Sequence, residues 1–281
     1  MKHVTSLRIG PVGFRIGSAW RAPIDALDDL YRDYPRPVIP DFNVHLFAAR
    51  PWRRYLRPSV HIGGDFVIPD AAPLPLAQAL LAAEMGMNLQ MALGQRGYLL
   101  LHASGVERDG RAVLMTGISG AGKSTLAALL MARGWRFMGD EFILIDPATG
   151  MAHAFPRLIS LKNEAIPVVE ALLPHARFGP RLTGTPKGTL RHVVPDAPAI
   201  AAMAEPAAPA LILFPRFGFD PAERPVPPSE AFVRLTQAST NYVTLAERGF
   251  EALTDLVARA PAIAIDYPDT ATGIEMVERL A

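Results

Sequence analysis

Cysteine is absent from the 281 residues of this chain. The absence excludes disulfide bonds, thiolate catalysis, iron–sulfur clusters and cysteine-ligated zinc, and it suits a reducing compartment. Lysine is scarce, because 24 of the 28 basic residues are arginine and only four are lysine, at Lys2, Lys123, Lys162 and Lys187. Since an ammonium group and a guanidinium group bind anions differently, these few lysines are candidates for specific anion contacts.

Long apolar runs and a surplus of charge are missing as well. Nowhere do 18 or more apolar residues follow one another, so we expect no membrane-spanning segment, and the first eight residues lack the apolar core of a signal peptide. The 28 basic residues nearly cancel against 27 acidic ones, which leaves no broad basic field for nucleic acid or an anionic membrane. We therefore expect a soluble, cytoplasmic protein that binds neither nucleic acid nor a membrane.

Short apolar runs broken by glycine, proline and aspartate occupy residues 1–73. They predict short strands with turns and a helix over 25–31, and hence a β-rich accessory domain. Over residues 76–95 the pattern changes, because Leu81, Met85, Leu89 and Leu93 recur at every fourth position. This spacing, with Leu80, Met87 and Met91 widening the stripe, predicts an amphipathic helix whose apolar face packs in a core. We place a domain boundary before this helix and expect the catalytic domain over residues 74–281.

The most regular pattern lies between residues 98 and 145. It predicts a strand over 98–106, a hairpin turn at Asp109-Gly110, a strand over 112–116, a helix over 123–133 ended by Gly134, and strand over 137–145. Further elements are expected as a strand over 153–162, a helix over 164–173, a loop over 195–209, strands over 210–214 and 262–267, and helices over 247–259 and 270–280.

Residues 117–124, Gly-Ile-Ser-Gly-Ala-Gly-Lys-Ser, match the phosphate-binding loop pattern G-x-x-x-x-G-K-[ST]. Glycines let successive N–H groups turn inward around an anion, and the helix that follows adds its positive N-terminus. Lys123 can reach the β- and γ-phosphates, and the Ser124 hydroxyl can ligate Mg²⁺. Because the loop joins a predicted strand to a predicted helix, we expect it to bind a nucleoside triphosphate. The expected nucleotide contacts are Gly117, Ser119, Gly120, Ala121, Gly122, Lys123, Ser124 and Thr125.

Two adjacent acids, Asp140 and Glu141, follow Lys123 by 17 and 18 residues. One helix and one turn fill this interval, so the acids can return to the edge of the same phosphate site. A carboxylate there can hold Mg²⁺ or accept the proton of an attacking hydroxyl. The alternative is a solvated strand end that carries two surface acids.

Residues 102–146 resemble the catalytic core of HPr kinase/phosphorylase and its relatives. The features that carry the resemblance are His102 before the hairpin, the loop from Gly117 to Ser124, Arg133-Gly134 at a helix end, and the acid pair Asp140-Glu141. The branch called HPr kinase-related kinases is the most similar, and residues 239–242 and 249–250 also resemble it. The resemblance implies an α/β fold with a P-loop kinase core of the HPr kinase/PEP carboxykinase type beside the N-terminal β-rich domain. It also makes self-association into a homo-oligomer an expectation.

The resemblance further implies roles for individual residues. Asp140 would be the base that activates a seryl hydroxyl, His102 would stand close to the transferring phosphoryl group, and Lys123 would complete the catalytic set. Ser124 would hold Mg²⁺ together with Asp140 or Glu141. Apart from the resemblance, His102 follows three leucines and fits a buried structural histidine equally well.

The chain departs from the family pattern in two places. Glu141 stands where the bacterial HPr enzymes have a second aspartate, and its longer side chain would move the metal or leave the acid outside the ligand set. No carboxylate lies between Asp146 and Glu164, where those enzymes place a further metal-site glutamate. We therefore do not expect phosphorolysis, the reverse reaction of those enzymes, to carry over.

Three functional hypotheses follow. The first is an ATP- and Mg²⁺-dependent kinase that transfers the γ-phosphoryl group to a serine of a protein or peptide. The second is a kinase with the same core that acts on a small molecule such as free serine, and the third is an ATP-binding regulator without transferase activity. Four further cations are candidates for phosphate contacts or surface charges: Arg157, Lys162, Lys187 and Arg191.

Overall fold

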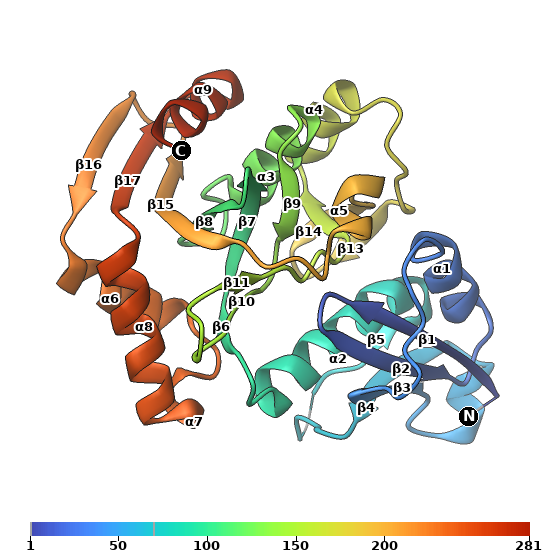
Figure 1. Cartoon of the computed structure of the whole chain (residues 1–281). Coiled ribbons are helices and arrows are strands. Elements are labelled where there is room, and N and C mark those ends of the chain that lie inside the picture. The colour runs from blue at the N-terminus through green and yellow to red at the C-terminus, as the bar shows by residue number, and fades with distance from the viewer. Residues whose placement is uncertain (1, 70) are drawn as a thin grey trace.

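A computed structural model of the chain describes residues 2–69 and 71–281. Strands form four sheets, and helices lie between and against them (Figure 1). The expected α/β class is therefore confirmed. Within the described residues, no helix has the length and apolar character needed to cross a membrane.

The first five strands of the chain form one sheet. Its strands are β1 (His3–Ile9), β2 (Val12–Ser18), β3 (Phe42–Phe47), β4 (Ser59–Gly64) and β5 (Leu74–Pro75), in that order. Only β2 and β3 run parallel, since α1 (Ala22–Leu30) crosses between them. The short 3-10 helices η1 (Pro51–Arg54) and η2 (Leu76–Gln78) precede α2 (Ala79–Gly94), which packs on β3 and β4. The strands and the two helices expected in this region are present, while the division into two domains stays a prediction.

The buried face of α2 differs from the expected stripe. Met85 and Leu93 are 47% and 40% exposed, whereas Met87 and Met91 are fully buried. The reason is a close approach between the helix and the sheet: a Cβ atom at Gly86 would lie 2.5 Å from Cγ1 of Val44. Small residues and flexible methionines therefore face the sheet, and the larger leucine stripe lies toward the side of the helix.

The central sheet has six strands in the order β16 (Ala222–Val226), β17 (Ala262–Tyr267), β15 (Ala208–Phe217), β8 (Arg111–Thr116), β7 (Ala103–Arg108) and β9 (Arg136–Gly139). Strands β17, β15 and β8 are parallel, and the other neighbours pair antiparallel. The carboxyl ends of β8, β9, β15 and β17 therefore meet at one edge of the sheet, where β7 begins. The segments that follow β8 and β9, residues 117–122 and 140–142, lie at this edge.

Helices cover both faces of the central sheet. On one face, α3 (Lys123–Ala132) and α9 (Thr270–Leu280) pack against Val113 and Met115 of β8. On the other face, α6 (Pro228–Ala238) and α8 (Glu247–Arg259) pack against Ala112 and Leu114 of the same strand. This division follows from the alternation of side chains along a strand.

Two three-stranded sheets and three short helices complete the fold. One sheet has the order β11 (Ala152–His153), β10 (Ile143–Ile145) and β6 (Leu99–Leu101), and the other β12 (Ile159–Lys162), β14 (Gly188–Val193) and β13 (Leu182–Thr185). The remaining helices are α4 (Ala165–Leu172), α5 (Ala197–Ala201) and α7 (Tyr242–Leu245).

Several expected elements are interrupted in the structure. The strand predicted over 98–106 breaks at His102 into β6 and β7, and the one over 137–145 breaks between Gly139 and Ile143 into β9 and β10, which belong to different sheets. The strand over 153–162 is likewise two strands, β11 and β12, with a connection between them. Each break lets one apolar run pass from one sheet to another, a change that a continuous apolar pattern does not reveal.

One helix contradicts an expected loop, and another lies where no element was predicted. Residues 195–209 contain α5, whose first turn is capped by the carboxylate of Asp196, which accepts a hydrogen bond from the backbone N–H of Ala199 at 3.1 Å. Helix α6 was not predicted at all. It begins with Pro228 in its first turn, where a missing N–H costs nothing, and its apolar face is narrow.

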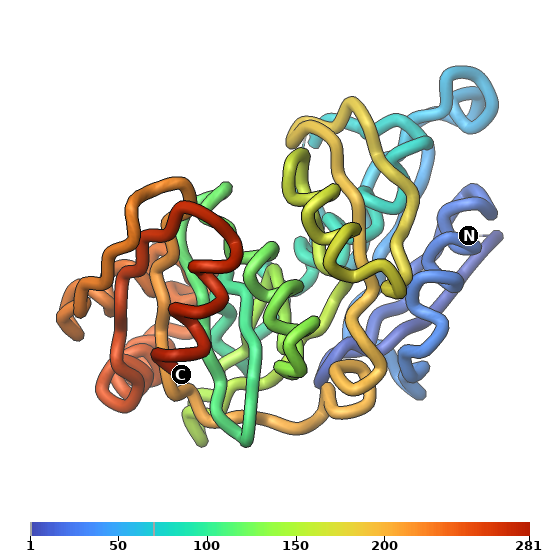
Figure 2. Tube along the Cα trace, turned by 90° about the horizontal axis from the view of Figure 1, so that it is seen from above, coloured from blue at the N-terminus to red at the C-terminus, as the bar shows by residue number. Residues whose placement is uncertain are grey.

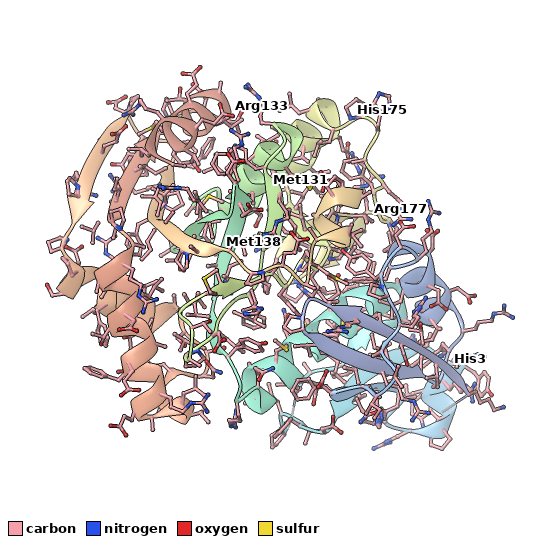
Figure 3. The ribbon with its side chains drawn as sticks, viewed as in Figure 1. His3, Met131, Arg133, Met138, His175 and Arg177 are labelled. Carbon is pink, nitrogen blue, oxygen red and sulfur yellow. The ribbon has the colours of Figure 1, made fainter. Side chains whose placement is uncertain are left out.

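The N-terminal sheet shares a core with later parts of the chain. Phe14 and Tyr31 belong to the same buried cluster as Leu144, Phe155 and Leu158. The N-terminal sheet lies at one side of the molecule and α6, α7 and α8 lie at the opposite side in both views (Figures 1 and 2). Met138 of β9, labelled near the middle of the molecule in Figure 3, is fully buried.

Candidate functional site

The phosphate-binding sequence forms the loop between β8 and α3, as the pattern predicts. Gly117, Gly120 and Gly122 have φ angles of +150°, +86° and +89°, conformations that favour glycine. Ile118, Ser119 and Gly120 are exposed, so the concave side of the loop is open to a ligand. The loop ends directly at the N-terminus of α3, whose first N–H groups lack partners within the helix. Ser124 and Thr125, both half-buried, lie in this first turn.

Tyr267 packs against the phosphate-binding loop. Its hydroxyl donates a hydrogen bond to the backbone oxygen of Ala121 at 3.0 Å, and a Cβ atom at Gly122 would lie 2.1 Å from that hydroxyl oxygen. Gly122 is therefore required for its φ angle and for the space that Tyr267 fills. The end of β17 thus determines the shape of a loop 146 residues earlier in the chain.

The ammonium group of Lys123 lies inside the curl of the loop. Its Nζ donates hydrogen bonds to the backbone oxygens of Gly117 at 2.7 Å and Ile118 at 2.9 Å. Burial lowers the pKa of Lys123 below its ordinary value, while the charge of Asp140 acts in the opposite direction. The ammonium group of Lys123 thus lies where it can bind a negatively charged phosphate. Its present acceptors are two neutral backbone oxygens, which form weaker hydrogen bonds than a charged phosphate oxygen does.

Asp140 follows β9 and reaches the same edge of the sheet. Its carboxylate accepts hydrogen bonds from the Ser104 hydroxyl at 2.7 Å and from the backbone N–H of Ser160 at 3.2 Å. Burial, and then the charge of Glu141, raise the pKa of Asp140, whereas hydrogen bonding by Ser124 is among the contacts that lower it. The structure therefore brings Asp140, Ser124 and Lys123 together. A raised pKa makes this carboxylate a stronger proton acceptor than an ordinary aspartate.

Glu141 lies beside Asp140 and is half-buried. Its Oε1 accepts a hydrogen bond from Nδ2 of Asn88 on α2 at 3.3 Å, while Oδ1 of Asn88 is buried without a hydrogen-bond partner in the described part of the chain. Helix α2, which packs on the N-terminal sheet, therefore reaches the acid pair. The motif around the loop contains no hint of this contact, because Asn88 lies more than 50 residues earlier.

The donor set suits Mg²⁺. Ser124, Asp140 and Glu141 offer one hydroxyl and two carboxylates, the hard oxygen ligands that this ion prefers. No group of three or more histidine, cysteine, aspartate or glutamate side chains able to hold a metal occurs within residues 2–69 and 71–281. The acids would therefore bind Mg²⁺ jointly with phosphate oxygens, which is the usual arrangement for this ion at nucleotide sites.

His102 lies at the break between β6 and β7, and its side chain is exposed. Its backbone N–H donates to the oxygen of Ala238 at 2.8 Å, and its own backbone oxygen accepts from the Thr116 hydroxyl at 3.0 Å. The histidine therefore stands beside the last residue before the loop. The alternative of a buried structural histidine is wrong, because the strand ends before this residue.

Residues 239–242 hold β6 in place. The side chain of Asn241 is buried, its Oδ1 accepts from the N–H of Leu100 at 2.9 Å, and its Nδ2 donates to the backbone oxygens of Gln95 and Tyr98 at 3.1 and 2.8 Å. One side chain thus satisfies three backbone groups of the segment that leads to His102.

The four further cations fall into different environments. Lys162, at the end of β12, is near enough to Lys123 to lower its pKa, so it shares the charge field of the loop. Lys187 lies exposed in the turn between β13 and β14. Arg191 binds Glu170 and the backbone oxygen of Gly179, a structural role.

Arg157 is buried in a network of its own. Its Nη1 donates to the backbone oxygen of Glu84 at 3.1 Å, and the carboxylate of Glu84 lies 2.5 Å from Nε2 of His192. Burial alone would raise the pKa of Glu84, but the charges of His192 and Arg157 bring it below the ordinary value. Arg157 also feels the charges of Glu141 and Asp140, which links this network to the acid pair.

A cavity of about 670 Å³ opens beside the start of the loop. Its lining includes His102 and Gly117, and also Arg216, Arg224 and Arg234, which the sequence did not single out. They come from β15, β16 and α6, and no local motif connects them. Nothing in the sequence around each arginine distinguishes it from the other arginines of the chain.

Comparison with known proteins gives limited likeness. A family described as SynChlorMet cassette protein ScmC matches residues 77–165, less than half of the chain but including the loop and Asp140. No curated protein matches. The solved structure of the HPr(Ser) kinase/phosphatase from Coxiella burnetii is 15% identical, with 64% of this chain and 96% of that chain covered and a TM-score of 0.30. Likeness at this level leaves the function to be argued from the chain's own residues.

Proposed function

We propose that the protein is an ATP- and Mg²⁺-dependent kinase that transfers the γ-phosphoryl group to a serine hydroxyl of a protein or peptide. The observation that carries the proposal is the arrangement of the loop, Lys123 and Asp140 at one edge of the central sheet. A loop that curls around an anion, a buried ammonium group within it and a carboxylate beside it are the parts that phosphoryl transfer requires. The resemblance of residues 102–146 to HPr kinase/phosphorylase agrees with this proposal.

The loop and α3 bind the phosphates of the nucleotide. Backbone N–H groups of the loop and the N-terminus of α3 supply fixed positive ends, which need no reorientation when charge develops in the transition state. Lys123 exchanges its two carbonyl acceptors for phosphate oxygens and neutralises part of their charge. An ordered ammonium group near the γ-phosphate also orients that group toward the acceptor.

Ser124, with Asp140 or Glu141, would hold Mg²⁺ at the phosphates. Bound there, the ion supplies additional charge neutralisation on the phosphate oxygens. Asn88 restrains the Glu141 carboxylate through its hydrogen bond to Oε1.

Asp140 acts as the base. The serine oxygen of the acceptor forms a bond to the γ-phosphorus, the bond from that phosphorus to the β,γ-bridging oxygen breaks, and ADP leaves. The hydroxyl proton passes to the carboxylate of Asp140, whose raised pKa favours its acceptance. Hydrogen bonds from Ser104 and Ser160 keep the carboxylate oriented, and His102 lines the cavity beside the start of the loop.

Incubation of the purified protein with ATP labelled in the γ-phosphate and a cell lysate tests the proposal. We expect the label on proteins or peptides, at serine, and no label when the α-phosphate carries it instead. Asp140→Asn should keep the affinity for ATP without Mg²⁺ within about threefold of the wild type and lower transfer by about 100-fold or more. Label on small compounds alone would show that the acceptor is a small molecule and not a protein or peptide. ATP binding without transfer to any acceptor would refute the kinase activity.

A further inference from the structure

The arginine-lined cavity beside the loop has a chemistry that the phosphate site does not use. Its volume of about 670 Å³ is in the range of a small-molecule or peptide side-chain site. It extends from His102 and Gly117 to Arg216, Arg224 and Arg234, and Asp266 is the one acid in its lining. Two of the three guanidinium groups are paired with carboxylates, so the third, on Arg224, supplies the unbalanced positive charge of the cavity.

Two of the arginines are held by neighbours. Arg216 forms two hydrogen bonds to the carboxylate of Asp266, at 2.9 and 2.6 Å, and its guanidinium group lies 3.9 Å from the ring centre of Phe219. Arg234 pairs with Glu230 and covers the ring of Phe214 at 4.7 Å. These contacts fix the planes of both groups, so their remaining N–H donors point in defined directions.

Arg224 differs from these two. It projects from β16 at the edge of the sheet, is exposed, and forms no side-chain hydrogen bond or ion pair within the described residues. An exposed guanidinium group that no other side chain of the described residues engages provides a free fork for a planar anion. Carboxylates fit such a fork with two parallel hydrogen bonds.

The cavity adjoins the start of the phosphate-binding loop. It shares only the first two loop residues, Gly117 and Ile118, with the phosphate site, and residues 119–124 lie outside its lining. It lies on the sheet face covered by α6 and α8, opposite the face on which α3 packs. An acceptor in this cavity would therefore reach the γ-phosphate from the side of His102.

We infer that this cavity is the acceptor subsite and that it recognises a carboxylate close to the serine hydroxyl. The inference rests on the proposed kinase function and adds the chemistry of its substrate. Arg224 binds the carboxylate, and Arg216 and Arg234 form the walls. The carboxylate belongs to an acidic residue next to serine in a peptide, or to free serine itself, and the test distinguishes the two sources.

The test measures binding by calorimetry in the presence of a saturating non-hydrolysable ATP analogue and Mg²⁺. The probes are a short peptide with glutamate on both sides of serine, its glutamine twin, its lysine twin, and free L-serine with L-serinamide as its control. We expect the glutamate peptide to bind about tenfold more tightly than the glutamine twin. In Arg224→Glu this order should reverse in favour of the lysine twin.

Arg248→Glu is the matched control. Arg248 is exposed on α8 outside the cavity lining, so the same change of charge should alter none of these affinities more than about twofold. Because Arg224 lies at the surface, its variants should keep the melting temperature of the wild type, and Arg224→Lys should retain part of the preference for glutamate. The affinity for a fluorescent ATP analogue should be the same in all variants.

Each result decides something. If free serine binds and the peptides do not, and if this binding is lost in Arg224→Glu, the carboxylate subsite is supported. The same result overturns the protein or peptide acceptor. Equal binding of the glutamate and glutamine twins, or binding of no probe at all, overturns the subsite, while transfer of phosphate to a peptide would leave the kinase intact. A loss of ATP affinity in Arg224→Glu would make the cavity a nucleotide subsite and also overturn the inference.

Discussion

Replacing Lys123 by methionine tests the role of the loop most simply. The change keeps an unbranched stem of similar length and removes the ammonium group, which donates to the backbone oxygens of Gly117 and Ile118. Without nucleotide, two hydrogen bonds are lost but a buried charge is removed as well. We therefore expect the free energy of unfolding to change by no more than about 1 kcal/mol.

The effect on nucleotide binding should be much larger. In the complex the ammonium group binds phosphate oxygens, and each charge-assisted hydrogen bond contributes about 1.5–3 kcal/mol. A loss of about 2–4 kcal/mol corresponds to an increase in Kd for ATP of about 30- to 1,000-fold. Titration with a fluorescent ATP analogue, followed by displacement with ATP, measures this change.

Lys2→Met is the matched control, because Lys2 is exposed and far from the loop in the sequence. It should leave the Kd unchanged. If Lys123→Met folds normally and binds ATP within about threefold of the wild type, the ammonium group does not meet the phosphates and the assignment of the loop is refuted.

Three further predictions concern the surroundings of the site. Asn88→Ala should weaken Mg²⁺ binding in the presence of ATP by about tenfold, because Glu141 loses its hydrogen bond, and leave metal-free ATP binding unchanged. Gly122→Ala should lower the free energy of unfolding by about 2–3 kcal/mol, against about 1 kcal/mol for Gly110→Ala, where a Cβ atom meets no neighbour. Glu84→Gln should lower it by about 3 kcal/mol near pH 7, measured by urea unfolding, because buried positive charge loses its partner.

The Glu84 prediction includes a pH dependence. The pKa of Glu84 is below its ordinary 4.5 in the folded protein, so its contribution to stability is present above that value and disappears as the pH falls through the folded pKa. The difference between wild type and Glu84→Gln should therefore shrink in acid. A stability difference between wild type and Glu84→Gln that does not depend on pH would contradict the charged network. Equal losses of unfolding free energy in Gly122→Ala and Gly110→Ala would contradict the contact with Tyr267. An unchanged Mg²⁺ affinity in Asn88→Ala would show that Asn88 does not support the metal site.

The loop and its flanking elements could be predicted from the sequence because their causes are local. Glycines at fixed intervals, an apolar strand before them and a helix after them determine the loop between β8 and α3. The helices α8 and α9 and the strand β17 have the predicted bounds for the same reason, since their periodic patterns are long and uninterrupted. The acid pair was also placed correctly in space, at the sheet edge that Lys123 occupies.

Contacts between distant segments could not be predicted. Asn88 reaches Glu141 from another sheet's helix, and Tyr267 determines the space at Gly122, although neither pair shares a motif. The exposure of His102 depends on the change of sheet between β6 and β7, which an apolar run hides. The arginine cavity was missed because three elements supply one guanidinium group each, and single surface arginines carry no pattern.

The most direct test of the central claim is a crystal structure of the protein with Mg²⁺ and a non-hydrolysable ATP analogue. We expect the β-phosphate within the loop over residues 118–123, Nζ of Lys123 moved from the oxygens of Gly117 and Ile118 to phosphate oxygens, and Mg²⁺ held by Ser124 with Asp140 or Glu141. A nucleotide bound elsewhere, with Lys123 still bound to the two loop oxygens, would contradict the account.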